Sequence, residues 1–162
     1  MTNKPKRIGR EGENAVAGRL RERGAFPDAE PRVLYGINDK GDITGTRGVV
    51  FQVKSGKAAE QASCNQIKQW LADAEAQREN AEGKLAVLVT KRAGCGAKRV
   101  GMWRAFVTML TMQDLLTNSN CWCGGVIPES LDNEAVEVTF DAMITLLQAA
   151  GHAHSPLNSF NQ

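Results

Sequence analysis

Residues 85–89, with the sequence Leu-Ala-Val-Leu-Val, form a continuous apolar run of strand length. Successive side chains of a strand point to opposite faces of a sheet, so a strand that is apolar at every position must be covered on both faces. The run therefore predicts a central strand in a sheet flanked by helices. The chain has 162 residues, close to the ~150 typical of one domain, so one such sheet is expected.

Helical and strand patterns alternate around this run. Helices are expected at residues 10–23, 64–82, 111–116 and about 136–150, and strands at 32–35, 42–44, 49–54, 85–89 and 100–109. Ser63 and Thr111 are expected to cap the second and third helices, and Gly24, Gly83 and Gly151 are expected to end helices. The fold class is therefore α/β, with a mixed sheet of about four or five strands and an added C-terminal helix.

The expected organisation is one domain. Residues 1–118 form the core, residues 119–151 add a loop and the last helix, and residues 152–162 form a tail. The basic start lacks the apolar region of a signal peptide, and no apolar stretch approaches the ~18 residues of a membrane span, so we expect a cytoplasmic location.

Four cysteines and two histidines are candidate metal ligands. They are Cys64, Cys95, Cys121, Cys123, His152 and His154. Without a secretory signal the cysteines are best interpreted as free thiols, because the Cys-x-Cys pair at 121–123 lacks the usual zinc-ligand spacing. A zinc site is the alternative.

The net charge of +2 does not by itself indicate a nucleic-acid partner. The basic residues, however, gather in two segments. The first contains Lys4, Lys6, Arg7, Arg10, Arg19, Arg21 and Arg23, and the second Lys91, Arg92, Lys98, Arg99 and Arg104. Such segments suit contacts with phosphates, and they equally suit a solvated face.

The polar residues of the strand at 49–54 suggest chemistry. Alternation places Gln52 and Lys54 on one face, and a three-residue loop ending at Gly48 would place Asp42 directly opposite Gln52. A carboxylate and an amide oxygen suit Mg²⁺, and a neighbouring ammonium can hold or deprotonate water and offset charge on a phosphate.

These residues resemble a known family. Gly41-Asp42-Ile43 followed by Gln52-Val53-Lys54 resembles the PD-(D/E)XK nuclease core, with Gln52 in place of the second acid and Gly41 in place of the proline. The start of the first helix, from Gly9 to Glu13, resembles the Gly-x-x-x-Glu motif of the Holliday-junction resolvase branch. Gln66 to Trp70 is similar to the Gln-x-x-x-aromatic helix of several branches, including VRR-NUC domains. The resemblance covers about residues 9–117 and implies a restriction-endonuclease-like core.

The resemblance implies a Mg²⁺-dependent DNA endonuclease, with Mn²⁺ as a substitute, that acts on branched DNA as a two-fold homodimer without a nucleotide cofactor or a membrane. The implied catalytic residues are Glu13, Asp42, Gln52 and Lys54, and the implied metal ligands are Glu13, Asp42, Gln52 and the carbonyl of Val53. The expected DNA contacts are Lys6, Arg7, Arg10, Gln66, Lys91, Arg92, Lys98 and Arg99. The apolar C-terminal helix is the candidate dimer interface.

Several alternatives remain beside this interpretation. Glu11 competes with Glu13, which is preferred because it shares a helical stripe with core-facing residues. Gln66 can do no more than complete the cap at Ser63, and Trp70 can be a core residue. The enzyme can belong to another branch, either VRR-NUC-like or a repair or restriction nuclease. A DNA-binding module that lost cleavage is the rival of another class, motivated by Gln52.

Overall fold

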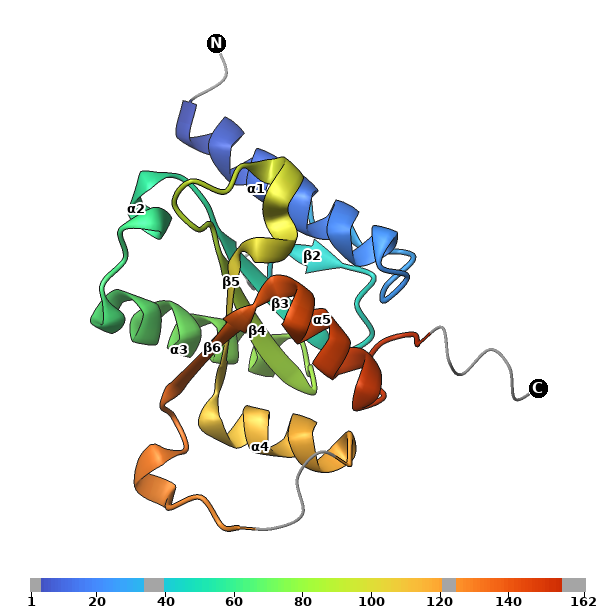
Figure 1. The fold of residues 1–162 in the computed structure, drawn as a ribbon. Coiled ribbons are helices and arrows are strands. Elements are labelled where there is room, and N and C mark those ends of the chain that lie inside the picture. The colour runs from blue at the N-terminus through green and yellow to red at the C-terminus, as the bar shows by residue number, and fades with distance from the viewer. Residues whose placement is uncertain (1–3, 34–39, 121–124, 156–162) are drawn as a thin grey trace, which may run out of the picture.

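The computed structural model describes residues 4–33, 40–120 and 125–155. Its main sheet has four strands in the order β3-β4-β5-β6 (Figure 1). These are β3 (Val49–Lys54), β4 (Leu85–Thr90), β5 (Arg104–Thr108) and β6 (Ala135–Thr139). Strands β3 and β4 are parallel and the other pairs are antiparallel, so the α/β class and the mixed sheet are confirmed.

Strand β4 occupies the interior of the sheet, as the apolar run predicts. All six of its residues are buried. It pairs with β3 on one side and β5 on the other. No helix in the described ranges is long and apolar enough to cross a bilayer.

Helices cover both faces of the sheet. On one face α1 (Lys4–Glu22), α4 (Met109–Asn118) and α5 (Phe140–Ala149) enclose the larger apolar cluster, which includes Phe51. On the other face α3 (Cys64–Asn80) covers a smaller cluster that includes Leu88. The two clusters divide the side chains of the strands by their alternation, so the odd and even residues of β3 face different helices.

Helix α3 begins as expected and ends differently. The Ser63 hydroxyl accepts a hydrogen bond from the Gln66 amide at 3.2 Å, which confirms the cap. At the other end it is Glu82, with φ 51°, and not Gly83 that takes the left-handed conformation common after helix ends. Position 83 instead needs a glycine because there is no room for a side chain: a Cβ there would lie 2.9 Å from Val50 Cγ2 and 3.0 Å from the Gly48 carbonyl oxygen.

Three other boundaries differ from expectation. Helix α1 begins at Lys4 rather than residue 10. Residues Ala97–Met102 form the 3-10 helix η1, so β5 begins only at Arg104. The cap of α4 is Thr108 rather than Thr111, since its hydroxyl accepts from the Thr111 amide at 3.2 Å. Two short helices were not expected, α2 (Lys57–Glu60) and η2 (Glu129–Leu131).

The expected hairpin ladder between residues 42–44 and β3 is not formed. Strands β1 (Glu30–Pro31) and β2 (Ile43–Thr44) instead make a two-stranded antiparallel ribbon of their own. Gly48, at the end of the turn that follows β2, has the expected left-handed conformation, with φ 88°. The ribbon reaches β3 through individual hydrogen bonds, which matter for the position of Asp42.

The C-terminal segment was only partly predicted. Residues 135–139 form β6 and not the start of a helix, because Val136 and Val138 alternate with Glu137 in the period of a strand. The sheet is therefore not complete at residue 118. Helix α5 follows, with Thr139 as its cap.

The apolar side of α5 is enclosed within this chain. Phe140, Met143, Ile144 and Leu147 are fully buried in the larger cluster. They are therefore not available for the dimer interface expected from the sequence. The segment after α5 lies against the loop that follows α1, since the His154 amide donates to the Ala25 carbonyl at 2.9 Å. Residues 156–162 of the expected tail lie outside the described residues.

Candidate active site

Glu13 of α1 and Asp42, which directly precedes β2, line one hollow. It has a volume of about 450 Å³, and we call it the carboxylate hollow. Lys6, Arg10 and Arg32 also contribute to its lining. Two of the expected metal ligands, 29 positions apart in the sequence, thus face the same space beside the β1–β2 ribbon.

The backbone around Gly41 determines where Asp42 lies. Gly41 has φ 89°, and a Cβ there would lie 2.7 Å from Val50 Cγ1 and 3.0 Å from the Phe51 carbonyl oxygen. The Asp42 amide donates to the Phe51 carbonyl at 2.8 Å, and Asp42 Oδ2 accepts from the Val53 amide at 2.6 Å. The carboxylate therefore lies against the edge of β3 rather than directly opposite Gln52, which corrects the expected register.

The carbonyl of Val53 faces the same edge of β3. The neighbouring Lys54 carbonyl accepts from the Lys91 amide at 2.9 Å, so the backbone groups of Lys54 point toward β4. Backbone groups of successive strand residues point to alternate sides, and both groups of one residue point the same way. Since the Val53 amide reaches Asp42, its carbonyl is also directed toward the Asp42 edge, where a cation can use it.

Glu13 is a partly desolvated carboxylate with one cationic partner. Burial raises the pKa of Glu13 above its usual value, and the nearby Arg10 opposes that shift. Arg10 Nη1 lies 3.2 Å from Glu13 Oε2 and also donates to the Arg32 carbonyl at 3.1 Å. A second cation in the hollow would favour the charged form of Glu13 further, because an opposite charge offsets the cost of desolvation.

Gln52 has a buried oxygen that lacks a partner. The residue is 4% exposed, and its Oε1 makes no hydrogen bond within the described part of the chain. A buried acceptor without a donor costs free energy, and a bound ligand would remove that cost. The Gln52 oxygen is therefore a candidate to bind a ligand. Gln52 does not line the carboxylate hollow: its side chain lies on the face of β3 that α3 covers, whereas Glu13 approaches from the other face.

Lys54 shares the α3 face with Gln52, as alternation predicts, and it also lies outside the lining of the hollow. Its Nζ lies 5.8 Å from the ring centroid of Trp70, on α3. Trp70 is half-buried, so it is a neighbour of Lys54 as well as a core residue. Its four-residue spacing from Gln66 was the signal in the sequence that could have placed it at the site.

Helix α1 approaches β3 closely at Gly12. A Cβ at Gly12 would lie 2.7 Å from Ser55 Oγ and 2.8 Å from Ser55 Cβ. Ser55, which follows the last residue of β3, donates from its hydroxyl to the Ile8 carbonyl at 2.9 Å. This contact places Glu13 near the end of β3.

Replacing Gly12 with alanine should destabilise the protein, although alanine favours a helix more than glycine. We expect the clash with Ser55 to lower the free energy of unfolding by about 1–3 kcal/mol. Gly18, on the same helix, has nothing within 4 Å of its Cβ position, so Gly18→Ala should raise the free energy of unfolding by up to about 1 kcal/mol. Urea denaturation measures both values, and equal stabilisation by the two variants would contradict the close approach.

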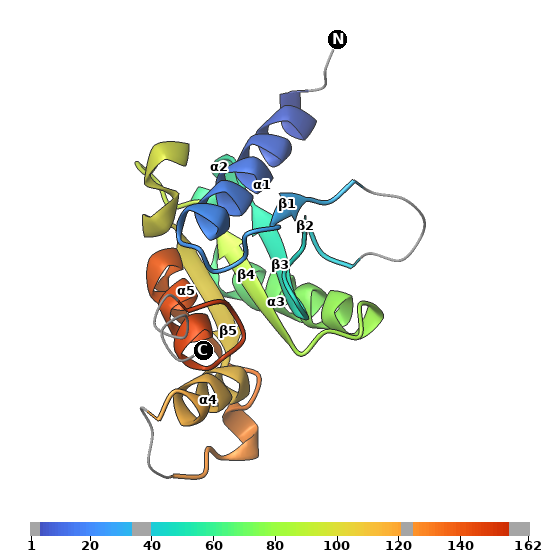
Figure 2. The same ribbon diagram turned by 90° about the vertical axis from the view of Figure 1, so that its right-hand side faces the viewer.

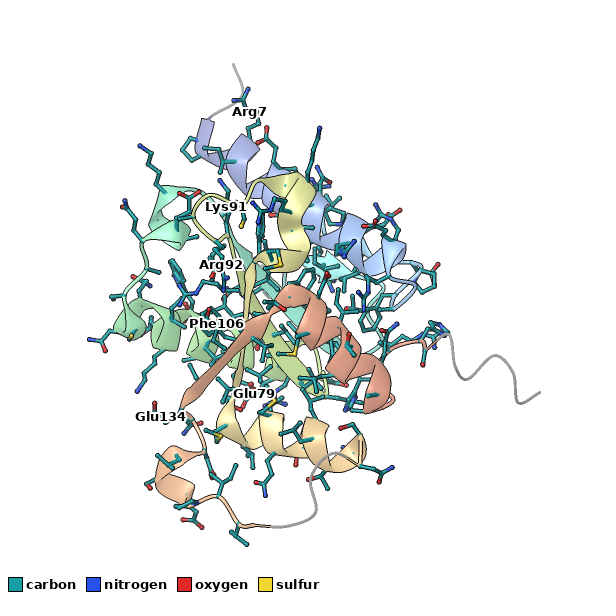
Figure 3. All side chains as sticks on the ribbon, in the orientation of Figure 1. Arg7, Glu79, Lys91, Arg92, Phe106 and Glu134 are labelled. Atoms are coloured by element: carbon teal, nitrogen blue, oxygen red, sulfur yellow. The ribbon has the colours of Figure 1, made fainter. Side chains whose placement is uncertain are left out.

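Several of the expected DNA contacts already have acidic partners. Arg7 Nε lies 3.5 Å from Glu11 Oε1, and Lys91 Nζ lies 2.7 Å from Glu60 Oε1. Arg92 Nη2 lies 3.5 Å from Glu137 Oε1. Arg7 and Lys91 lie toward one end of the molecule, Arg92 lies nearer the middle, and Glu79 and Glu134 lie toward the other end (Figure 3). These pairs are partly exposed and weak, so phosphates can compete for the cations.

The remaining expected contacts are spread over different elements. Gln66 is exposed in the first turn of α3, and Lys98 and Arg99 are exposed on η1. Figure 2 shows η1 on one side of α1 and the β1–β2 ribbon on the other. The structure therefore separates Lys98 and Arg99 from Asp42, while Lys6 and Arg10 lie beside it.

Among the described residues, no group of three or more His, Cys, Asp and Glu side chains is arranged to hold a metal. The carboxylate hollow has two such side chains, and the other expected ligands are an amide oxygen and a backbone carbonyl. Cys64 is exposed and Cys95 is buried, and both are free thiols. Cys121 and Cys123 lie outside the described residues.

Comparison of the chain with protein-family models, with curated proteins and with solved structures found no match.

Proposed function

We propose that this protein is a Mg²⁺-dependent DNA endonuclease of the PD-(D/E)XK type, similar to Holliday-junction resolvases. The observation that carries the proposal is the shared hollow of Glu13 and Asp42 at the open edge of β3. The two carboxylates come from a helix and from the residue before β2, and both face the same space. The motif Gln52-Val53-Lys54 ends the same strand.

The donor set fits Mg²⁺, which prefers oxygen ligands and keeps several waters. Glu13, Asp42 and the Val53 carbonyl would hold the ion in the carboxylate hollow, and Gln52 Oε1 would have to reach it from the α3 face of β3. Mn²⁺ would substitute for Mg²⁺. Gln52 contributes no charge, so Glu13 supplies the second carboxylate. The bound ion would stabilise the negative charge that develops on the phosphate during hydrolysis.

Lys54 would position the attacking water and offset charge on the phosphate with its ammonium group. The Lys54 ammonium lies 5.8 Å from the centroid of the Trp70 ring, so the aromatic ring is its neighbour at the end of β3. Hydrolysis would leave a 5′ phosphate, as the family resemblance implies. The enzyme would act in the cytoplasm as a homodimer.

A DNA-binding module that lost cleavage is the second candidate, and one observation favours it. Gln52 stands where the family has an acid. The fold and the basic residues would then serve binding alone.

A panel of labelled substrates separates these candidates. The purified protein is incubated with a four-way junction, a flap, a duplex and a single strand, in Mg²⁺, Mn²⁺ or EDTA. We expect metal-dependent cleavage with a preference for the junction. Preference for flaps or ends would assign another nuclease branch, and binding without cleavage at any protein concentration would assign the binding module.

Substitution of Gln52 tests its place in the metal site. Gln52→Glu adds a charge at nearly constant volume, so Mg²⁺ should bind more tightly through Coulomb attraction, and Gln52→Leu removes the oxygen. The measured quantity is the Mg²⁺ concentration at half-maximal cleavage. Glu should lower it and Leu should raise it by several-fold, and identical values for all three proteins would remove Gln52 from the site.

A further inference from the structure

A second hollow adjoins the carboxylate hollow. It lies between the β1–β2 ribbon, the turn that joins β2 to β3, and the end of α3, and its volume is about 160 Å³. Of the described residues that line it, Arg32, Lys40 and Arg47 are cationic and none is acidic. We call it the basic hollow. Figure 2 shows the ribbon and α3 on the same side of the molecule.

Arg32 has an unsatisfied donor. Its Nε is buried and has no hydrogen-bond partner within the described ranges. A buried N–H group without an acceptor is costly, and cations that line the same hollow without an acid among them repel one another. An anion in the basic hollow would relieve both costs.

The turn between β2 and β3 adds backbone donors. Arg47 and Gly48 have φ values of 50° and 88°. The amides of Thr46, Arg47 and Gly48 donate no hydrogen bond to any described residue. Successive free amides in a turn form a concave site that suits the oxygens of a phosphate.

The two hollows meet along one stretch of chain. Arg32 lines both of them. Lys40 and Ile43 line the basic hollow, while the residues between them, Gly41 and Asp42, line the carboxylate hollow. Phosphates that follow one another along a strand could therefore occupy the two hollows in succession.

We infer that the basic hollow binds the backbone phosphate of DNA that neighbours the scissile phosphate. This inference rests on the proposed function. The bound strand would then run past Lys6 and Arg10 to the β1–β2 ribbon, and not across η1 on the other side of α1. Lys40 and Arg47 are thereby assigned as DNA contacts, which the sequence did not single out.

Charge-neutralising variants test the path. The affinity for a labelled four-way junction is measured against salt concentration, in EDTA, for the wild type, Lys40→Gln and Arg47→Gln. The matched control is Lys68→Gln, an exposed cation of α3 that pairs with Glu134 at 2.8 Å. Lys40→Gln and Arg47→Gln should each flatten the log-log slope by about 0.9, and the control should not change it.

A second arm locates the phosphate and distinguishes DNA from small anions. Single neutral methylphosphonates are placed along the strand near the cleavage position. One position should weaken binding to the wild type and leave binding to Arg47→Gln unchanged. If inorganic phosphate shifts the amide resonances of Thr46 to Gly48 while no methylphosphonate position behaves in this way, the hollow binds a small anion and the inference is overturned.

The outcomes separate the inference from the proposed function. Cleavage by the wild type, with salt slopes for Lys40→Gln and Arg47→Gln equal to that of Lys68→Gln, overturns the inference alone. Binding without cleavage overturns the proposed nuclease function, and the salt slopes still show whether the basic hollow contacts DNA. A wild-type protein that does not bind DNA overturns both.

Discussion

Asp42→Asn should abolish DNA cleavage and leave junction binding intact or tighter. Asparagine is close in size to aspartate, and its oxygen can still accept the hydrogen bond from the Val53 amide, which is 2.6 Å long in the wild type. The variant therefore keeps the fold and loses only the charge that would hold the metal. We expect the cleavage rate to fall by about 10³, equivalent to about 4 kcal/mol of transition-state stabilisation.

The control for this prediction removes a carboxylate from the same region. Glu11, on α1, is exposed and pairs with Arg7, and it lies two residues before Glu13. Glu11→Gln should change the cleavage rate less than twofold, whereas Glu13→Gln should lower it together with the affinity for Mg²⁺. Single-turnover cleavage measures all three rates. Wild-type activity in Asp42→Asn would remove the carboxylate hollow from the mechanism.

Trp103→Ala should cause the largest loss of stability. Trp103 is 2% exposed, and its indole Nε1 donates to the Cys95 carbonyl at 2.9 Å. Its own carbonyl accepts from the Phe140 amide at 2.8 Å, so it joins η1, the preceding loop and α5. Truncation of the side chain leaves a cavity and leaves the Cys95 carbonyl without its donor. We expect the free energy of unfolding to fall by about 3–5 kcal/mol. Urea denaturation followed by circular dichroism measures the change.

Two further variants separate the contribution of the Trp103 ring from that of its N–H donor, and the burial of Trp103 from that of Trp70. Trp103→Phe keeps most of the ring and loses the N–H donor, so it should cost about 1–3 kcal/mol. Trp70→Ala should cost less than Trp103→Ala because Trp70 is only half-buried, and it should slow cleavage because Lys54 loses its neighbour. Equal losses for Trp70→Ala and Trp103→Ala would contradict the burial of Trp103.

Local patterns were sufficient for elements whose cause is local. The apolar run at 85–89 has one physical solution, a strand covered on both faces, and β4 is that strand. Ser63 caps α3 through an interaction that spans three residues, so its outcome is written in the sequence nearby. The alternation of β3 likewise placed Gln52 and Lys54 on one face.

Features that depend on distant partners were predicted less well. Residues 136–139 alternate as a strand does, but the apolar residues that follow them continue at helical spacing and predict a helix, and pairing with β5 selects the strand β6. The expected loop of three residues implied that Asp42 opposes Gln52. The preference of β2 for β1 shifted Asp42 to the edge of β3, where its carboxylate replaces a backbone partner.

The sequence by itself determined which residues are candidates for chemistry: two carboxylates, an amide and a lysine in a spacing that resembles that of the PD-(D/E)XK family. Only the tertiary structure decided which of them meet. Glu13 and Asp42 share a hollow because Gly12 lets α1 approach the end of β3, and Gly41 lets the chain turn against Phe51. Arg32, Lys40 and Arg47 carry no motif, and they converge because the ribbon and the turn fold together. Proximity across the chain depends on packing, which no local pattern encodes.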